Sequence, residues 1–423
     1  MKRPLPSDDI ILTSDNASVD TPVADEESRF GFDELFFSRT DSGGVIKYGN
    51  SVFQRVSAYD WEELLGKPHK IIRHPDTPRA VFWLLWETIK KGEPIGAYVK
   101  NRAKDGRYYW VFALVTPVRN GYLSVRLRPS SDYFDIVQKL YEDLAEKERR
   151  ETLAPADSAA LLLAKLKELG FKDYPAFMTA ALGKELISRD RHLKNIQDPV
   201  IFKFDELLKV TQSLLREAES IARAHEENKI VPTNFRILAS RLGQSGDTIA
   251  VISDNYSLLS DDMNKIVEGF ISSAQDVVDS IITSYFLAGT ARVQLEMSEF
   301  FQKEEASSSQ SMLEAEIQIF NSQRGEHALK VRQSLGEVSK RCSGFRRTCV
   351  ELERITTGLE VMRVVGKVEC SNHSSVKDRA DDLLAKLETF QRTVTGALKS
   401  LTHMHGLIQQ ETDNLRRHAE KAA

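Results

Sequence analysis

The sequence predicts a small α+β domain followed by a mainly α region of helical bundles or coiled coils. Between Thr233 and Ala423 the chain contains no proline, the residue that breaks helix interiors. All four tryptophans, which stabilise compact apolar cores, lie between Trp61 and Trp110. These two observations divide the chain into a compact mixed domain near its start and a long helical remainder.

The composition is that of a globular or coiled-coil protein. Of 423 residues, 41% are hydrophobic and 28% are charged, and the formal net charge of -4 gives no electrostatic reason to expect a nucleic-acid partner. No apolar run approaches the roughly 20 residues of a transmembrane segment, and the first residues lack the apolar core of a secretion signal. Because three cysteines cannot form a paired framework, we expect a soluble, cytoplasmic protein.

The first part of the chain changes character near residue 30. Residues 1–28 are rich in Ser, Asp, Pro and Thr, which predicts a disordered tail. Residues 31–130 contain short apolar segments separated by Gly and Asn turns, with a helical stretch between the second segment and the third. We therefore expect an antiparallel five-stranded sheet in the order two strands, helices, three strands, with the helices over one face.

The remaining residues are predicted to be helical. Residues 131–198 form a linker, and its first helix is placed to carry a signal away from the sheet. Residues 199–301 show apolar spacings of three and four on two arms around a glycine turn at 243–247, which predicts an antiparallel helical hairpin. Residues 302–423 predict a second hairpin or bundle that turns after Gly366. Since a two-helix hairpin cannot cover its own apolar stripe, we expect a homo-oligomer or packing against the second hairpin.

Several motifs within residues 31–130 share one register with a sensor family. They include Gly49-Asn50, the string Ile72-Arg73-His74-Pro75-Asp76-Thr77-Pro78, Lys90-Lys-Gly-Glu-Pro94 and Val99-Lys-Asn101. They resemble the PAS sensor fold and, more narrowly, the sensor domain of bacterial aerotaxis receptors. The resemblance implies non-covalent binding of FAD and a response to oxygen or redox state. The pocket residues that it implies are Asn50, Arg73, His74, Asp76, Trp86 and Asn101.

The chemistry of these residues suits a flavin. Arg73 can pair with phosphate, His74 can donate to the ring system, and Asn101 can both donate to and accept from a ring edge. One departure is Ile95, which stands where the aerotaxis pattern has a tryptophan. A structural interpretation is the alternative, in which Asp76 caps the helix that begins near Pro78. Haem ligation by a histidine is a third interpretation.

The turn at residues 243–247 and its flanks resemble the cytoplasmic hairpin tip of chemotaxis receptors. The positions in register with that tip are Asn234, Ile237, Ala239, Arg241, Gly243, Gly246, Ala250, Val251 and Ser253. The resemblance implies chemotaxis receptors, their coupling protein or their kinase as partners. Two departures, Leu238 in place of a glutamate and Pro232 in an arm that is usually unbroken, predict weak direct activation of the kinase.

No nucleotide-binding loop, cyclase signature or metal-hydrolase histidine pair is present, so we expect no enzyme and assign no catalytic or metal-binding residue. The leading hypothesis is a redox or oxygen sensor of aerotaxis-receptor type that binds FAD and signals through a helical hairpin. The alternatives are a cofactor-free PAS and coiled-coil scaffold for dimerisation, and a haem-binding gas sensor.

Overall fold

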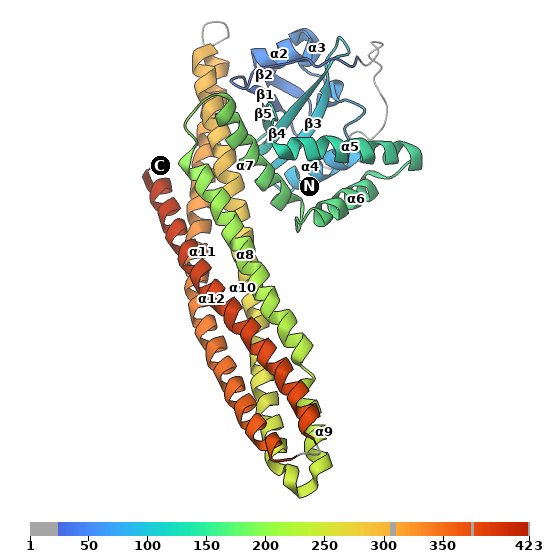
Figure 1. The fold of residues 1–423 in the computed structure, drawn as a ribbon. Helices are drawn as coiled ribbons and strands as arrows, with labels where there is room; N and C mark the ends of the chain where they lie inside the picture. The colour runs from blue at the N-terminus through green and yellow to red at the C-terminus, as the bar shows by residue number, and fades with distance from the viewer. Residues whose placement is uncertain (1–23, 305–309, 374–375, 422–423) are drawn as a thin grey trace, which may run out of the picture. The chain divides into compact units, whose positions relative to one another are not determined.

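The computed structural model describes residues 24–304, 310–373 and 376–421, which divide into two units (Figure 1). The first unit contains the chain up to Phe202 together with Ile282–Val331, and the second contains Lys203–Ile281 and Arg332–Ala423. Two long helices, α10 (Asp247–Glu304) and α11 (Gln310–Ser371), contribute residues to both units.

A five-stranded antiparallel sheet forms the centre of the first unit, with the strand order β2-β1-β5-β4-β3. The strands are β1 (Phe36–Thr40), β2 (Ile46–Gly49), β3 (Ile95–Arg102), β4 (Tyr108–Val118) and β5 (Gly121–Leu127). Four short helices separate the second strand from the third: α2 (Ser51–Ser57), α3 (Trp61–Leu64), the 3-10 helix η1 (His69–Ile72) and α4 (Arg79–Ile89). This order confirms the predicted α+β fold class.

The strand register assigns the side chains to two faces. Directly paired residues share a face, and side chains alternate along each strand. Ser38 is paired with Ser124, and Ser124 with Val115, so these residues define the face that we call the inner face. Helices α2, η1 and α4 pack over this face. Its other members include Phe36, Ile95, Ala97, Asn101, Tyr109, Ala113, Tyr122 and Arg126.

Helices also cover the opposite face of the sheet, which differs from the prediction of helices over one face. The ring of Phe37 lies 5.1 Å from that of Phe301 in α10 and 5.3 Å from that of Phe320 in α11. The ring of Tyr98 stacks on Phe134 at 6.0 Å. The helices of the predicted linker are α5 (Asp132–Glu151), α6 (Pro155–Glu168) and α7 (Tyr174–His192). Because apolar side chains of the predicted linker pack against the sheet, the linker is part of the core of the first unit.

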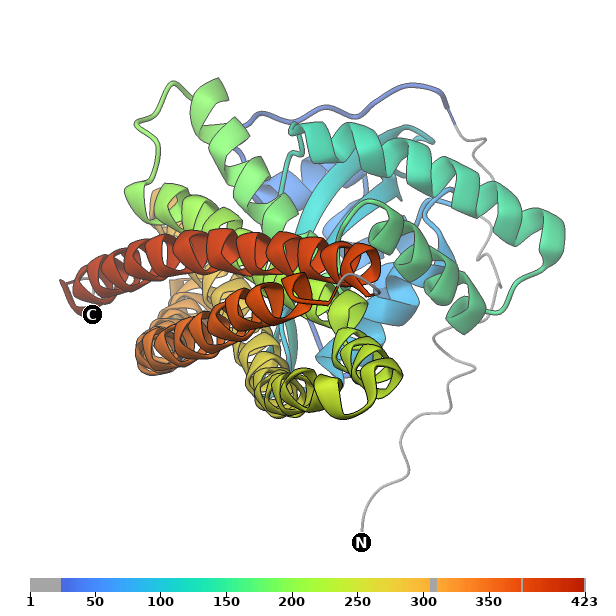
Figure 2. The ribbon, with the colours of Figure 1, turned by 60° about the horizontal axis from the view of Figure 1, so that its bottom comes forward.

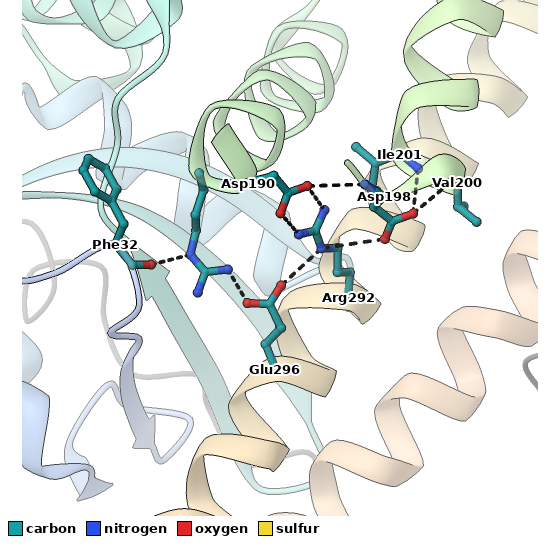
Figure 3. A network of polar contacts seen from close by, with 8 residues as sticks. Phe32, Asp190, Asp198, Val200, Ile201, Arg292 and Glu296 are labelled. Carbon is teal, nitrogen blue, oxygen red and sulfur yellow. Dashed lines mark hydrogen bonds and ion pairs between the residues drawn. The ribbon is translucent and has the colours of Figure 1, made fainter. Parts of the chain in front are cut away.

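A buried network of charges joins three segments of the first unit (Figure 3). Arg189 at the end of α7 donates to the carbonyl of Phe32 at 2.7 Å and pairs with Glu296 of α10. Arg292 of α10 pairs with both Asp190 and Glu296. Both Arg189 and Asp190 are almost wholly buried, so each buried charge in this network has a counter-charge.

Most of the predicted disordered tail, residues 1–28, lies outside the described residues. From Ala24 onward the chain is part of the fold, because the backbone N–H of Ala24 donates to the carbonyl of Gly106 at 2.9 Å. Ser28 donates through its backbone to Tyr108 and through its hydroxyl to the carbonyl of Val56. The apolar-poor composition did not reveal this backbone pairing.

In the second unit, four long helical segments close into a bundle within a single chain (Figure 2). The segments belong to α8 (Pro199–Asn228), α10, α11 and α12 (Lys377–Lys421). Each segment contacts its two neighbours. These contacts are His225 with Ser260, Phe270 with Phe345, Arg363 with Gln391, and Glu411 with Lys203. The first hairpin therefore buries its apolar stripe against the second hairpin of the same chain.

The connection between the arms of the first hairpin is bent rather than a continuous helix. Helix α8 ends at Asn228 and α9 (Val231–Leu242) follows, with Pro232 in its first turn, where a missing N–H is tolerated. A 3-10 turn, η2 (Gly243–Gly246), then leads into α10. A Cβ at Gly246 would lie 2.1 Å from the carbonyl oxygen of Ala239, so only glycine allows this close approach.

Replacing Phe345 by alanine is expected to destabilise the second unit. Phe345 is 2% exposed and lies 5.1 Å from the ring of Phe270 on the neighbouring helix. Deleting a buried phenyl ring lowers the free energy of unfolding by about 3–5 kcal/mol. Urea unfolding followed by circular dichroism at the helical band measures this loss.

The matched control is Val350→Ala on the same helix, because Val350 is 58% exposed. Its effect is expected to stay within about 0.5 kcal/mol. Equal effects of the two substitutions would contradict the packing of α10 against α11.

Candidate functional site

Asn50 has a structural role at the start of α2. Its Oδ1 accepts from the backbone N–H groups of Phe37 (3.0 Å) and Phe53 (3.2 Å), and its Nδ2 donates to the carbonyl of Leu35 (2.8 Å). The side chain thus caps α2 and ties it to β1. Asn50 therefore holds the start of α2 against β1.

The string from Arg73 to Asp76 lies beside β3. Arg73 forms an isolated backbone bridge with Asn101, and its guanidinium lies over the ring of Phe82 at 4.0 Å. Burial lowers the pKa of Arg73 to about 10. The structure therefore brings Arg73 and Asn101 together through their backbones, with His74 next to Arg73 in the chain.

His74 is neutral and buried, with 1% of its side chain exposed. Burial, helped by the nearby positive charge of Lys100, lowers its pKa to about 4. Its Nδ1 accepts from the backbone N–H of Asp76 at 3.1 Å, which places the ring proton on Nε2. His74 therefore offers one buried N–H donor.

Asp76 does not cap a helix. Its carboxylate pairs with Lys100 at 2.9 Å and with Arg149 at 3.4 Å, and 44% of the side chain is exposed. Burial opposes ionisation of Asp76, but the hydrogen bond and the charge of Lys100, together with the charge of Arg149, outweigh it and lower the pKa. The cap of α4 comes instead from Glu148 of α5, which accepts from the backbone N–H groups of Arg79 and Ala80. The interpretation of Asp76 as a helix cap is wrong.

Trp86 lies half-buried on α4, with its ring edge-on to that of Tyr122 at 5.5 Å. A Cβ at Gly44 would lie 3.2 Å from the Trp86 ring, so the β1–β2 turn also closes on this side chain. Trp86 contributes apolar wall next to Tyr122 of the inner face. Ile95, at the position of the missing tryptophan, is 4% exposed and lies on the same face.

The inner face carries buried polar atoms for which no described residue supplies a hydrogen-bond partner. Four of them lie in this part of the first unit: His74 Nε2, Asn101 Nδ2, Tyr109 Oη and Ser124 Oγ. Each can donate a hydrogen bond. A buried donor without an acceptor costs about 1–3 kcal/mol, so four on one face indicate that something outside the chain accepts from them.

One further residue of this face, Arg126, was missed by the sequence analysis. Only 5% of it is exposed, and Nη1 donates to Ser38 Oγ at 3.0 Å. Its Nη2 lies 2.7 Å from Nε2 of His69. Burial, together with the charge of Arg126, lowers the pKa of His69 to about 3, so this histidine is neutral and accepts. The alternating pattern of β5 was the available signal, since it places Arg126 two residues from Ser124 on a buried strand.

Taken together, the site is rich in donors and poor in acceptors. Its complement is a ligand edge that carries carbonyl oxygens, imine nitrogens or negative charge. The described residues contain no group of three His, Cys, Asp or Glu side chains with the geometry of a metal site. In the same described ranges, no helix is long and apolar enough to cross a membrane.

Comparisons with known proteins agree with this picture. Residues 46–124 match the PAS fold. The chain is 43% identical over 129 residues to the aerotaxis receptor of Escherichia coli (strain K12), covering 29% of this chain and 24% of that protein. It is 32% identical over 83 residues to the nitrogen fixation regulatory protein of Klebsiella pneumoniae, with 20% and 17% covered. The biofilm dispersion protein BdlA of Pseudomonas aeruginosa is 30% identical over 82 residues, with 19% and 20% covered.

The matched stretches span about a quarter of these relatives or less. The match to residues 46–124 begins at the start of β2 and ends within β5, so it includes all the helices of the inner face. The five-stranded sheet, the helices that cover it and the sequence match show that this part of the chain has the PAS fold and is similar in sequence to a segment of the aerotaxis receptor.

Proposed function

We propose that the chain is a redox or oxygen sensor that binds FAD on the inner face of its PAS domain. The four buried donors without an acceptor carry this proposal, because the pyrimidine edge of a flavin ring presents carbonyl oxygens and ring nitrogens that accept hydrogen bonds. The likeness to a protein named an aerotaxis receptor supports the same assignment. We further propose a cytoplasmic signalling protein rather than an enzyme.

The residues that would hold the flavin are the donors of the inner face and the wall around them. His74 and Asn101 would donate to the ring edge, and the apolar side chains of Ile95, Val99 and Trp86 would contact the ring system. A bound flavin supplies reversible electron transfer, and with it a change of charge at the ring edge. His74 Nδ1 is already fixed by the Asp76 N–H, so its Nε2–H is the group free to respond.

Helix α5 contacts the segments next to His74, so it would move in response to a change of charge at the ring edge. Its Glu148 caps α4, and its Arg149 pairs with Asp76, two residues from His74. At its other end, the buried Glu185 of α7 accepts from Ser131 N–H and Oγ, just before α5, and from Tyr98 of the sheet. A movement of the His74 loop would therefore reach α5 through ionic contacts and α7 through the sheet.

For the output, we propose the helical hairpin with its turn at η2, whose register resembles a chemotaxis receptor tip. Its partners would be chemotaxis receptors, their coupling protein or their kinase, and self-association of the chain would use surfaces outside the filled bundle. The rival functions are a cofactor-free scaffold for dimerisation and a haem-binding gas sensor. The absorption spectrum separates them, because a flavin band, a haem Soret band and a colourless protein are distinct results.

The purified protein is expected to be yellow and to release FAD on denaturation. Replacing Asn101 by leucine removes a buried donor that lacks a protein acceptor, so it should lower FAD affinity about tenfold or more while changing the stability of the FAD-free protein little. Equilibrium dialysis measures the affinity, and tryptophan fluorescence reports the stability because all four tryptophans lie in this domain.

Asn50→Leu is the matched control with the opposite outcome. It leaves three buried backbone groups without partners, so it should lower stability by about 3 kcal/mol or more. If Asn101→Leu destabilises the FAD-free protein as much as Asn50→Leu does, Asn101 is structural and the assignment fails.

Acid is expected to destabilise the PAS domain in a defined range. The pKa of His74 is lowered from 6.5 to about 4, so between these values the unfolded chain binds a proton that the folded domain does not. The contribution is complete above pH 6.5 and is lost as the pH falls toward 4. Tryptophan-detected melting at a series of pH values measures it, and His74→Gln should flatten the slope in this range. An unchanged slope would show that His74 is not held neutral.

The hairpin tip is expected to activate a chemotaxis kinase weakly when the protein is reconstituted alone with kinase and coupling protein. Leu238 is buried in α9 and presents no carboxylate, and the break before Pro232 alters the course of the arm. Kinase phosphorylation assays with an intact receptor as reference measure this activity. Strong activation that is lost in Asn234→Ala or Arg241→Ala would contradict the prediction.

A further inference from the structure

Helix α7 is packed on almost every side within the first unit. Fourteen of its 19 residues are buried, including Glu185, Arg189 and Asp190. A surface helix normally buries one apolar stripe, so burial on all sides means that α7 has partners on opposite faces. One set of partners belongs to the PAS sheet and the start of α5, and the other set belongs to α10.

On the sheet side, α7 is held by the carboxylate of Glu185. Its Oε1 accepts from the hydroxyls of Tyr98 and Ser131, both at 2.7 Å. Its Oε2 accepts from the backbone N–H groups of Ser130 at 2.6 Å and Ser131 at 3.1 Å. Glu185 is wholly buried, and these four donors are uncharged. Because a buried carboxylate is costly without its hydrogen bonds, α7 must follow any movement of the donors.

On the other side, the buried charges of α7 find their counter-charges on α10. Arg189 lies one turn after Glu185 and pairs with Glu296, and Asp190 pairs with Arg292 (Figure 3). Separating two such partners would leave an uncompensated charge inside the protein. Electrostatics therefore hold α7 against α10 at the end of the helix.

Two glycines interlock α7 and α10 further along the contact. Tyr285 of α10 lies over Gly183 of α7, where a Cβ would be 1.8 Å from the tyrosine Oη. In return, Leu182 and Leu186 of α7 lie over Gly289 of α10, where a Cβ would be 2.8 Å from Cδ2 of Leu182. Each helix thus places large side chains in a notch of the other, which blocks sliding along the contact.

We propose that α7 is a rigid coupling helix that makes α10 follow the connection between β5 and α5. Glu185 attaches it to the sheet, and the interlocked glycines and ion pairs attach it to α10. Helix α10 is continuous from Asp247 to Glu304, and its first part belongs to the second unit. A displacement at the end of β5 is therefore passed by α7 to α10 and along α10 to the hairpin. The inference rests on the proposed function for the origin of that displacement and adds the path by which it leaves the PAS domain.

The coupling is tested by variants on the two sides of α7 in the full-length protein. Glu185→Met removes both acceptor oxygens, and Gly289→Leu pushes α10 away from α7. The matched controls are Glu299→Met and Gly269→Leu, because Glu299 and Gly269 are exposed on α10 and a Cβ at Gly269 would meet no atom within 4 Å. Hydrogen exchange read by mass spectrometry on the flavin-free protein compares residues 127–135, α10 residues 282–301 and helix α12.

Glu185→Met is expected to speed exchange about tenfold or more in residues 127–135 and also in residues 282–301, although these hydrogen bonds of Glu185 go to the sheet and the start of α5. Because coupling is reciprocal, Gly289→Leu should speed exchange in residues 127–135 as well. Glu185→Gln should retain slow exchange, since its amide oxygen can accept from the backbone N–H groups while its NH₂ group donates to the hydroxyl oxygens. Both controls, and α12 throughout, should match the wild type.

Faster exchange confined to residues 127–135 in Glu185→Met would overturn the proposal, because Glu185 would then be a local contact only. Unchanged exchange of residues 127–135 in Gly289→Leu would overturn it as well. If α12 accelerates equally, the substitution unfolds the whole chain. The milder Tyr98→Phe, which removes one of the four donors, then decides by the same comparison of residues 127–135 and 282–301.

A second measurement uses the protein loaded with FAD. Chemical reduction of the bound FAD should change exchange at residues 243–247 in the wild type but not in Glu185→Met, while the FAD affinity from equilibrium dialysis stays unchanged. An equal response in both proteins would overturn the path through α7. A wild-type protein that binds no FAD would overturn the proposed function instead, and the flavin-free exchange would still decide the coupling.

Discussion

Both faces of the five-stranded sheet are covered by helices, and this coverage governs the chemistry of the first unit. A polar group on such a sheet is cut off from water, so it must find a partner in the chain or in a ligand. On the outer face Glu185 meets part of this need, because it accepts from Tyr98 and from the start of α5. On the inner face several donors remain without acceptors. These donors are the observation on which the proposed ligand site rests.

The sequence predicted the sheet and its helices well, because turn signals and apolar alternation are local properties. It also named Arg73, His74 and Asn101 as candidates for one site, and in the structure a backbone bridge joins Arg73 to Asn101. It did not predict that Asn50 would tie the start of α2 to the β1 segment or that Glu148 would cap α4 in place of Asp76, because each depends on a contact between separate segments of the chain. The burial of Arg126 depends likewise on the register of β5 against β1.

The helical region shows the same limit of local patterns. Spacings of three and four residues predicted apolar stripes, but such spacings do not determine which helices pack against each other. In the structure the partner of the first hairpin is the second hairpin, as the contact between the rings of Phe270 and Phe345 shows. The expectation that the stripe must be covered was therefore met within the chain, and the buried cysteines of α11 are core residues of this bundle.

A four-helix bundle made from one chain lacks the two-fold symmetry of a bundle made from two identical hairpins. When two identical hairpins associate, every substitution appears twice and each contact is repeated across a two-fold axis. Here the two hairpins differ in sequence, so a substitution changes only one position of the bundle. The turn at residues 243–246 and the connection after Ser371 can therefore differ in sequence without affecting each other. The bundle therefore combines two different inter-helix connections, where a symmetric pair of hairpins would repeat one connection twice.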